Sequence, residues 1–162
     1  MPPSIEIYGL TIQRNLITID SFLERYIIRE ANEYRPNEEL EVREPSSNSS
    51  HISTIWHPYE GLTSAIQYGL ANSHRSFSLY FPTKYIHITR AILSFTIDAN
   101  LVLGLSTEES ADIIVVKELS KDLARFFGCH LGVAVVEEPP PLNEQLFIKL
   151  QQQPSVLHFE AL

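Results

Sequence analysis

The sequence predicts an α+β protein in which a mostly antiparallel sheet carries its helices on one face. Stretches of alternating apolar residues, typical of strands, interchange along the chain with apolar residues at three- and four-residue spacing, typical of helices. Residues 85–97 and 101–105 flank a short Asp-Ala-Asn turn and predict an antiparallel hairpin. Segments of about 4–45 and 101–139 resemble each other and indicate two similar strand–helix–strand units.

The two similar segments share their turns as well as the order of their elements. Gly9 and Gly104 each follow a strand, within Gly-Leu-Thr and Gly-Leu-Ser, and a Glu-Pro pair closes both segments. Gly9 lies 36 positions before Pro45, and Gly104 lies 35 positions before Pro139. If one unit is present twice, the strands of the two copies superpose and their helices lie on the same face of the sheet.

The first unit is expected to contain a strand at 4–10, a helix after Thr18 and a short strand at 40–43. Thr18 is a candidate N-cap, because its side-chain oxygen can accept from an unpaired backbone N–H of the first helical turn. Apolar residues then recur at helical spacing, as on a helix that lies on a sheet: Ile19, Phe22, Leu23, Tyr26, Ile27 and Ala31. Residues 45–50, rich in serine, predict a loop.

The middle segment, 51–100, is expected to add a helix at 62–70, a strand at 76–81 and the long extended stretch at 85–97. Pro82 ends the strand at 76–81, because proline cannot donate a hydrogen bond to a sheet.

The second unit is expected to begin its helix at the capping-box sequence Ser106-Thr107-Glu108-Glu109. Gly128 follows the last apolar residue of this helix and is typical of a helix C-terminus. Residues 131–136 are apolar on both alternating faces, which predicts a central buried strand. In the C-terminal appendage, 140–162, Asn143 is expected to cap a short helix ahead of an extended tail.

Together these elements predict one domain over residues 1–162, with a ferredoxin-like or related arrangement. The lone cysteine, Cys129, excludes an internal disulfide framework and fits a reducing compartment. The first residues lack the basic start and apolar run of a signal peptide, and no apolar run is long enough to span a bilayer. We therefore expect a cytoplasmic protein without a membrane partner.

The charge of the chain bears on its partners. Twelve Lys and Arg residues stand against twenty Asp and Glu, which gives a net charge of −8. Because phosphate binding depends on Lys and Arg, no nucleic-acid partner is expected. An acidic surface instead favours a basic protein partner, which long-range electrostatics would attract.

The sequence His57-Pro58-Tyr59-Glu60-Gly61 holds the candidate catalytic residues His57, Tyr59 and Glu60. A neutral imidazole is suited to proton transfer near pH 7, and a neighbouring carboxylate can orient it. The alternative interpretation is a turn that contains a solvated acid.

The stretch from Phe77 to Arg90 holds the candidate binding residues Tyr80, Tyr85, His87 and Arg90. Aromatic side chains beside arginine are typical of recognition surfaces. The alternative interpretation is that alternate residues of this stretch pack into the sheet.

No metal or cofactor is expected. The histidines at 51, 57, 74 and 87 follow no compact ligand spacing, and Cys129 has no second cysteine with which to form a thiolate site. Glycine-rich phosphate-binding motifs are absent from the sequence.

These observations favour a non-catalytic protein-binding module of the inhibitor, immunity or adaptor type, with a homodimer also compatible. The alternative is an enzyme or small-ligand-binding protein with a pocket near His57, Tyr59 and Glu60. For the first hypothesis, acidic residues expected on solvent-facing sides of the two units are the candidate contacts: Glu24, Glu30, Glu33, Glu108, Asp112, Glu118 and Asp122.

Overall fold

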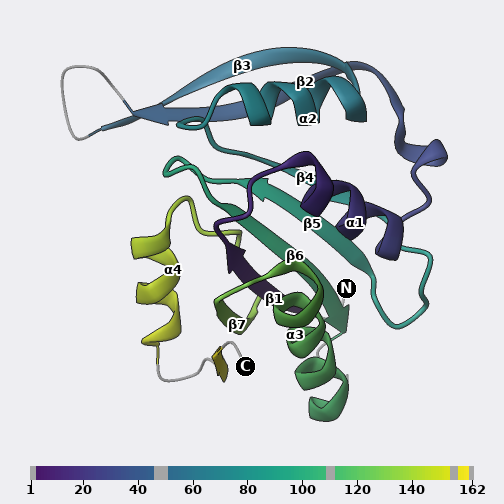
Figure 1. Cartoon of the computed structure of the whole chain (residues 1–162), viewed down its shortest axis with the longest axis vertical. Coiled ribbons are helices and arrows are strands. Elements are labelled where there is room, and N and C mark those ends of the chain that lie inside the picture. The colour runs from purple at the N-terminus through teal and green to yellow at the C-terminus, as the bar shows by residue number, and fades with distance from the viewer. Residues whose placement is uncertain (1–2, 46–50, 109–111, 154–156, 161–162) are drawn as a thin grey trace.

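The computed structural model describes residues 3–45, 51–108, 112–153 and 157–160. These residues form an α+β fold, as predicted from the sequence, built on an antiparallel sheet of six strands with a two-stranded hairpin beside it (Figure 1). The sheet has the order β4 (Phe77–Phe81), β5 (Arg90–Phe95), β6 (Leu101–Glu108), β1 (Ser4–Thr11), β7 (Leu131–Val136) and β8 (Leu157–Glu160). The hairpin consists of β2 (Tyr34–Pro45) and β3 (Ile52–Gly61). Residues 46–50, where the sequence predicts a loop, lie outside the described part.

Strand β1 lies inside the sheet and pairs with β6 on one side and β7 on the other. Its side chains alternate between two buried faces. Ile7 belongs to the apolar cluster on the first face, whereas Tyr8 and Leu10 belong to the cluster on the second. Both faces of the sheet must therefore be covered.

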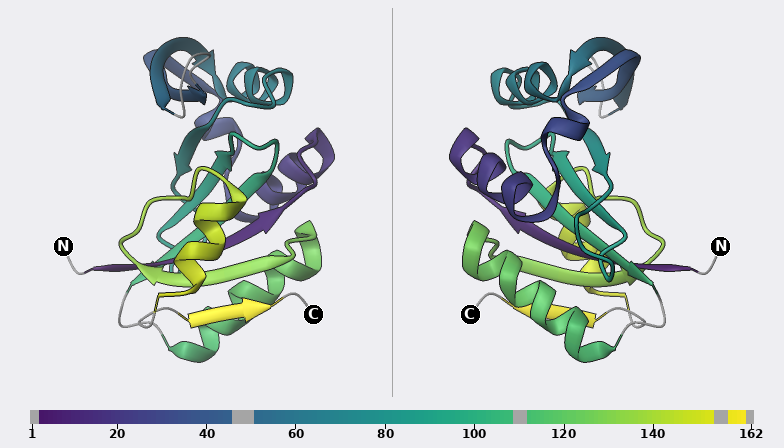
Figure 2. Two further views of the ribbon diagram at one scale, coloured as in Figure 1. Left: turned by 90° about the vertical axis from the view of Figure 1, so that its left-hand side faces the viewer. Right: turned by 90° about the vertical axis from the view of Figure 1, so that its right-hand side faces the viewer.

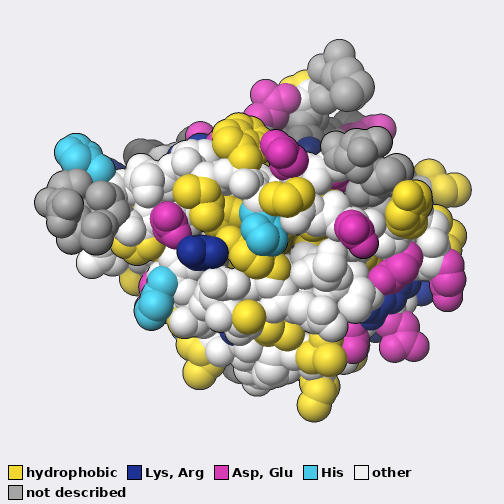
Figure 3. Space-filling view, turned by 90° about the horizontal axis from the view of Figure 1, so that it is seen from above, with side chains coloured by type: hydrophobic (Ala, Val, Ile, Leu, Met, Phe, Trp, Pro, Cys, Tyr) yellow, Lys and Arg dark blue, Asp and Glu magenta, His cyan; other side chains and the backbone are white. Residues whose placement is uncertain are grey.

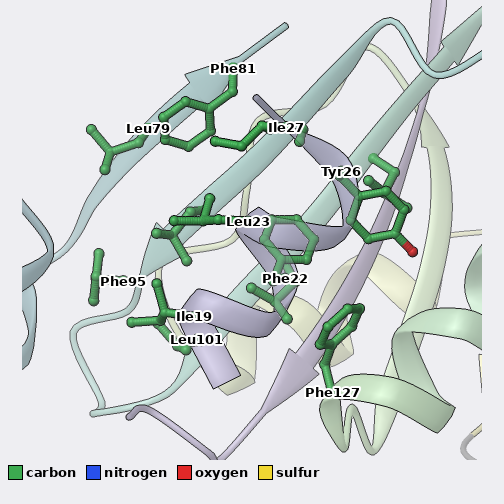
Figure 4. Packing of buried hydrophobic residues seen from close by; sticks show 14 of the residues in the cluster. Ile19, Phe22, Leu23, Tyr26, Ile27, Leu79, Phe81, Phe95, Leu101 and Phe127 are labelled. Atoms are coloured by element: carbon green, nitrogen blue, oxygen red, sulfur yellow. The ribbon is translucent and has the colours of Figure 1, made fainter. Parts of the chain in front are cut away.

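The first face carries three helices, in line with the sequence prediction: α1 (Leu16–Tyr26), α2 (Leu62–Ala71) and α3 (Ile113–Phe127). Figure 4 shows Phe22 and Tyr26 of α1 packed beside Phe127 of α3, and the ring centroids of Phe22 and Phe127 lie 5.4 Å apart. The hairpin contributes Leu40 and Val42 to the same cluster. The core is therefore continuous from the sheet through the helices to the hairpin.

The second face carries α4 (Glu144–Gln151), which departs from the expectation that the helices share one face (Figure 2). Phe147 and Leu150 of α4 cover Leu10 of β1 and Val133 of β7. The reason lies in β7, whose apolar side chains alternate between both faces and so require cover on each. The predicted burial on both faces is therefore confirmed for Val133, Ala134 and Val135, whereas Val136 is 51% exposed.

The predicted duplication is wrong in its second strand. Residues 40–43 pair with β3 outside the six-stranded sheet, whereas β7 lies directly beside β1. The two matching glycines, Gly9 and Gly104, lie against different neighbouring side chains. A Cβ on Gly9 would lie 2.7 Å from Cys129 Sγ, on the side of α3, and a Cβ on Gly104 would lie 2.8 Å from the ring of Tyr8. Close packing thus excludes a side chain at each position for a separate reason.

Two predicted helix starts are corrected by the structure. The N-cap of α1 is Asn15, whose side chain accepts from the Thr18 N–H at 2.9 Å. The N-cap of α3 is Asp112, because β6 continues through Ser106 to Glu108, paired with β1. Long-range strand pairing has outweighed a local capping sequence there.

The predicted helix ends at Asn143 and Gly128 are confirmed. Asn143 caps α4 by accepting from the Leu146 N–H, and Gly128 ends α3 in the left-handed conformation with φ of 67°.

Arg14 joins the end of α2 to the turn between β5 and β6. Its guanidinium donates to the carbonyls of Gly69 and Asn72 at 2.7 and 2.8 Å, and to those of Thr96 and Asn100 at 2.7 and 3.2 Å. It also lies 5.0 Å from the ring centroid of Phe95. Burial lowers the pKa of Arg14 to about 10, against the opposite effect of Asp98, so the side chain stays cationic at neutral pH.

Replacing Arg14 by lysine is therefore expected to destabilise the fold. One ammonium cannot reach carbonyls in both segments, so Arg14→Lys should lower the free energy of unfolding by about 2–4 kcal/mol. Arg125→Lys, at an exposed position of α3, should change it by less than about 0.5 kcal/mol. Urea denaturation measures both, and equal stabilities would show that Arg14 does not join the two segments as described.

Cys129 is a buried thiol whose side chain lies against Gly9. Burial raises its pKa from 9.0 to about 12. The thiol therefore stays neutral in the folded chain at pH values where the unfolded chain already ionises, so its contribution to stability is complete below pH 9 and is lost as the pH rises toward 12.

The alkaline stability of the wild type should accordingly depend on this residue. Between pH 8 and pH 10, the wild type should lose about 1 kcal/mol more unfolding free energy than Cys129→Ala, as measured by urea denaturation at each pH. Parallel pH dependences of the two proteins would contradict the assignment of a neutral buried thiol.

Candidate functional site

A groove opens on the second face between strand β4, strand β2 and the residues that lead into α4. Its volume is about 500 Å³. Its lining combines aromatic, proline, apolar and charged residues: Glu41, Arg43, Ser76, Phe77, Ser78, Tyr80, Glu138, Pro139, Pro140, Pro141, Leu142, Leu146 and Leu150. We call this hollow the β4 groove.

The wall of the β4 groove opposite β4 is residues 137–142, here called the crossing segment, which passes over the second face. The Glu137 N–H donates to the Ser4 carbonyl at one end, and the Leu142 carbonyl accepts from the Ile97 N–H at the other. Between them, the Tyr8 hydroxyl donates to the Glu138 carbonyl at 2.6 Å. The three prolines have no N–H to satisfy, which suits a segment that crosses a sheet without pairing to it.

Tyr8 reaches the crossing segment because Gly104, its register partner on β6, leaves room for the ring. Burial raises the pKa of the Tyr8 hydroxyl well above its ordinary value, and the nearby Glu6 acts in the same direction. The hydroxyl therefore remains a donor throughout the neutral range.

A second hollow of about 360 Å³ adjoins the β4 groove and shares Tyr80, Glu138, Pro139 and Pro140 with it. Its floor holds Glu6, whose side chain is only 3% exposed. This carboxylate accepts from Ser4 Oγ at 2.7 Å, from Arg90 Nη2 at 3.2 Å and from Ser106 Oγ. Ser106, expected from the sequence to cap a helix, is instead a buried donor to Glu6.

Arg90 is held from two sides. Glu6 binds one nitrogen, and the ring centroid of Tyr80 lies 4.7 Å from the guanidinium carbon. The side chain of Arg90 is nevertheless 43% exposed. The buried carboxylate thus orients a cation at the edge of the two hollows.

The two hollows together carry more negative than positive side chains. Glu6, Glu41, Glu137 and Glu138 line them, against Arg43 and Arg90. Arg43 also pairs with Glu41 at 3.5 Å. The lining therefore suits a cationic group better than an anionic one.

Exposed apolar side chains stand beside these carboxylates. Tyr80 is 39% exposed and Leu146 40%. Trp56, 62% exposed, lies directly opposite Glu41 in the hairpin and therefore on the same face of the ribbon as a groove residue. Seen from above, the hairpin end of the molecule shows hydrophobic and acidic side chains interspersed (Figure 3). Large aromatic side chains left in water are typical of recognition surfaces.

The structure divides the four candidate binding residues into two pairs. Tyr80 and Arg90 meet at the β4 groove. Tyr85 and His87 lie in the loop between β4 and β5, with their ring centroids 5.9 Å apart, and Tyr85 lies 6.3 Å from Tyr26 of α1 on the other side of the sheet. The extended stretch expected at 85–97 begins only at Arg90, because the Thr83 hydroxyl bonds the carbonyls of Tyr85 and Ile88 and closes the loop.

The candidate catalytic residues all lie on β3, and their side chains alternate. His57 stacks on Tyr68 with centroids 3.9 Å apart, and the buried Tyr59 donates to Glu38 Oε2 at 2.6 Å. Glu60 is exposed and lies on the opposite face of the strand from both. The structure therefore does not bring the carboxylate to the imidazole.

Several acidic residues expected as contacts on the helices have partners within the chain. Asp122 pairs with Arg25 at 3.6 Å, and Glu118 pairs with Lys121 at 3.7 Å. Glu33 pairs with Arg29 and accepts from Thr63, and Asp112 caps α3. Glu24 and Glu30 are exposed. The helical surface is thus less acidic in effect than its composition indicates.

Sequence reasoning missed the importance of Glu41 and of the crossing segment. The available signal was the run from Glu137 to Pro141, which in the sequence indicates the charged end of a strand followed by three prolines. Because β2 meets the sheet edge at Arg43 and the crossing segment passes over the second face, residues about a hundred positions apart line one groove, and no local pattern indicates that.

Nowhere in the described ranges do three or more His, Cys, Asp or Glu side chains gather as a metal ion would require. Among the same residues, no helix is both long enough and apolar enough to cross a membrane.

No family model, curated protein or solved structure matches the chain.

The buried Glu6 carboxylate gives a test of this part of the site. Arg90→Ala should lower the free energy of unfolding by about 1–3 kcal/mol, less than for a fully buried pair because the guanidinium is partly solvated. Glu6→Gln in the same chain should recover part of that loss, since the unpaired charge is then gone. Urea denaturation of the single and double variants measures the coupling, and strictly additive losses would contradict the pair.

Proposed function

We propose that the protein is a non-catalytic protein-binding module, of the inhibitor, immunity or adaptor type, that binds a basic segment of a partner in the β4 groove. The observation that carries the proposal is the lining of the groove. Exposed aromatic, proline and leucine side chains stand there among carboxylates that outnumber the guanidiniums.

The energetics of such a surface favour this kind of partner. Burial of Tyr80, Leu146 and the prolines would supply most of the affinity, since hot spots of interfaces are commonly aromatic and central. The carboxylates would raise the association rate and discriminate against acidic partners. A second copy of this chain is a less suitable occupant, because each copy carries a net charge of −8.

The alternative function, an enzyme or small-ligand-binding protein with a pocket near His57, Tyr59 and Glu60, has less support. A general base needs its orienting carboxylate within hydrogen-bond reach. Here the imidazole stacks on Tyr68, and Glu60 lies on the other side of the strand.

Charge reversal tests the proposal. The wild type, immobilised at low salt, should retain a protein from a lysate of the source cell, and raising the ionic strength toward about 0.5 M should release it. Glu41→Lys with Glu138→Lys should abolish retention of that protein, because the reversed charges repel a basic segment. Glu24→Lys with Glu30→Lys, on exposed sites of the helical side, is the matched control with the same change of net charge.

Three results would contradict the proposal. Loss of the protein only from the control variant would place binding on the helical side. Equal retention by all three chains would show that the groove charges take no part. A His57-dependent rise of the melting temperature with a small molecule, together with no retained protein, would favour the alternative function.

A further inference from the structure

We propose that the β4 groove takes its basic segment as an added β-strand, hydrogen-bonded to the outer edge of β4. This inference rests on the proposed function and specifies its mode of recognition.

Strand β2 pairs with the β4 edge at one described position. The Arg43 N–H donates to the Ser76 carbonyl and the Ser76 N–H donates to the Arg43 carbonyl, both at 2.8 Å. This is the reciprocal pair of bonds of an antiparallel ladder. Ser76 therefore directs both of its backbone groups away from β5 and toward the edge.

Alternation along β4 extends the same edge to Ser78. Backbone groups of residues two apart in a strand point the same way, so the N–H and carbonyl of Ser78 face outward, whereas those of Phe77 and Leu79 serve the pairing with β5. Continued antiparallel pairing would bring Glu41 of β2 opposite Ser78. Among the described residues, the pairing of β2 with the β4 edge does not continue from Arg43 to Glu41, and Glu41 and Ser78 both line the β4 groove.

The space between β2 and β4 is thus closed by the Arg43–Ser76 bridge at one end. It widens from there into the β4 groove of about 500 Å³. A strand placed in this space would continue the ladder that Arg43 starts. Addition of a strand to a sheet edge takes its affinity from main-chain bonds and its specificity from alternate side chains.

The charges around the edge specify those side chains. The side chains of Ser78 and Tyr80 point to the second face, on which Glu138 and the crossing segment lie. Alternate side chains of an added strand would point to that face and meet Glu138 and Tyr80, so Lys or Arg is favoured at these positions. The intervening side chains would point to the first face, beyond Leu79 and Phe81, where apolar residues are favoured.

The probe is an end-capped peptide of eight residues in which lysine and valine alternate, titrated into the ¹⁵N-labelled full chain and followed by NMR. The wild type should bind it, with a downfield shift and slowed exchange of the Ser78 amide proton. Ser78→Pro removes the outward N–H, which an edge strand tolerates, and should weaken binding about tenfold. Ser78→Ala keeps the N–H and removes only the hydroxyl, so its affinity should stay within about twofold.

A second arm leaves the protein unchanged. The same peptide with every amide N-methylated keeps its side chains and charges but donates no main-chain bond, and it should also bind about tenfold more weakly. This arm decides the question if Ser78→Pro does not fold.

The outcomes separate the two proposals. Binding that survives both Ser78→Pro and N-methylation, but is lost with Glu41→Lys and Glu138→Lys, overturns strand addition and leaves the basic-segment function standing. No binding of the lysine peptide to the wild type, or binding that the groove charges do not affect, overturns both.

Discussion

The hydrogen bond from the Tyr8 hydroxyl to the Glu138 carbonyl fixes the crossing segment, which forms one wall of the β4 groove. It holds the crossing segment over β1, between anchors at Ser4 and Ile97. The helix α4, which follows the segment, packs on Leu10 and Val133, and its residues Leu146 and Leu150 line the β4 groove beside the segment. The ring of Tyr8 fits only because Gly104 has no side chain. One buried phenol thus holds in place a wall of the groove that we assign to binding.

The two faces of β1 have different surroundings, because the side chains of neighbouring residues in a strand point in opposite directions. On the face that carries α3, the absence of a side chain at Gly9 leaves room for the side chain of Cys129. Toward the groove, the buried Glu6 gathers Ser4, Ser106 and Arg90 into a polar cluster. A buried carboxylate is costly unless it is paired and bonded, so its presence orders the groups around it. The pairing with Glu6 therefore fixes the position of the partly exposed Arg90 guanidinium at the edge of the two hollows.

Local signals in the sequence predicted much of the fold and little of the site. The strands near 4–10, 76–81, 101–105 and 131–136, the C-terminus of α3 at Gly128, the start of α4 at Asn143, and the α+β class all follow from periodicity and capping residues. The predictions at Ser106 and at 40–43 were wrong because distant strand partners decided both. Of the candidate binding residues, Tyr80 and Arg90 meet, but the bend closed by Thr83 takes Tyr85 and His87 elsewhere. The β4 groove depends on where β2 meets the edge of β4, which no local spacing encodes.

The proposed function places the partner on the second face, beside β4. Hydrogen exchange of the wild type, measured with and without the retained partner, distinguishes this face from the helical face. The proposed binding site predicts slower exchange in β4 (Phe77–Phe81) and at the start of α4, with α1 and α3 unchanged, because bound backbone and covered edges exchange more slowly. Slower exchange in α1 and α3, with β4 unchanged, would contradict it and place the partner on the helical face.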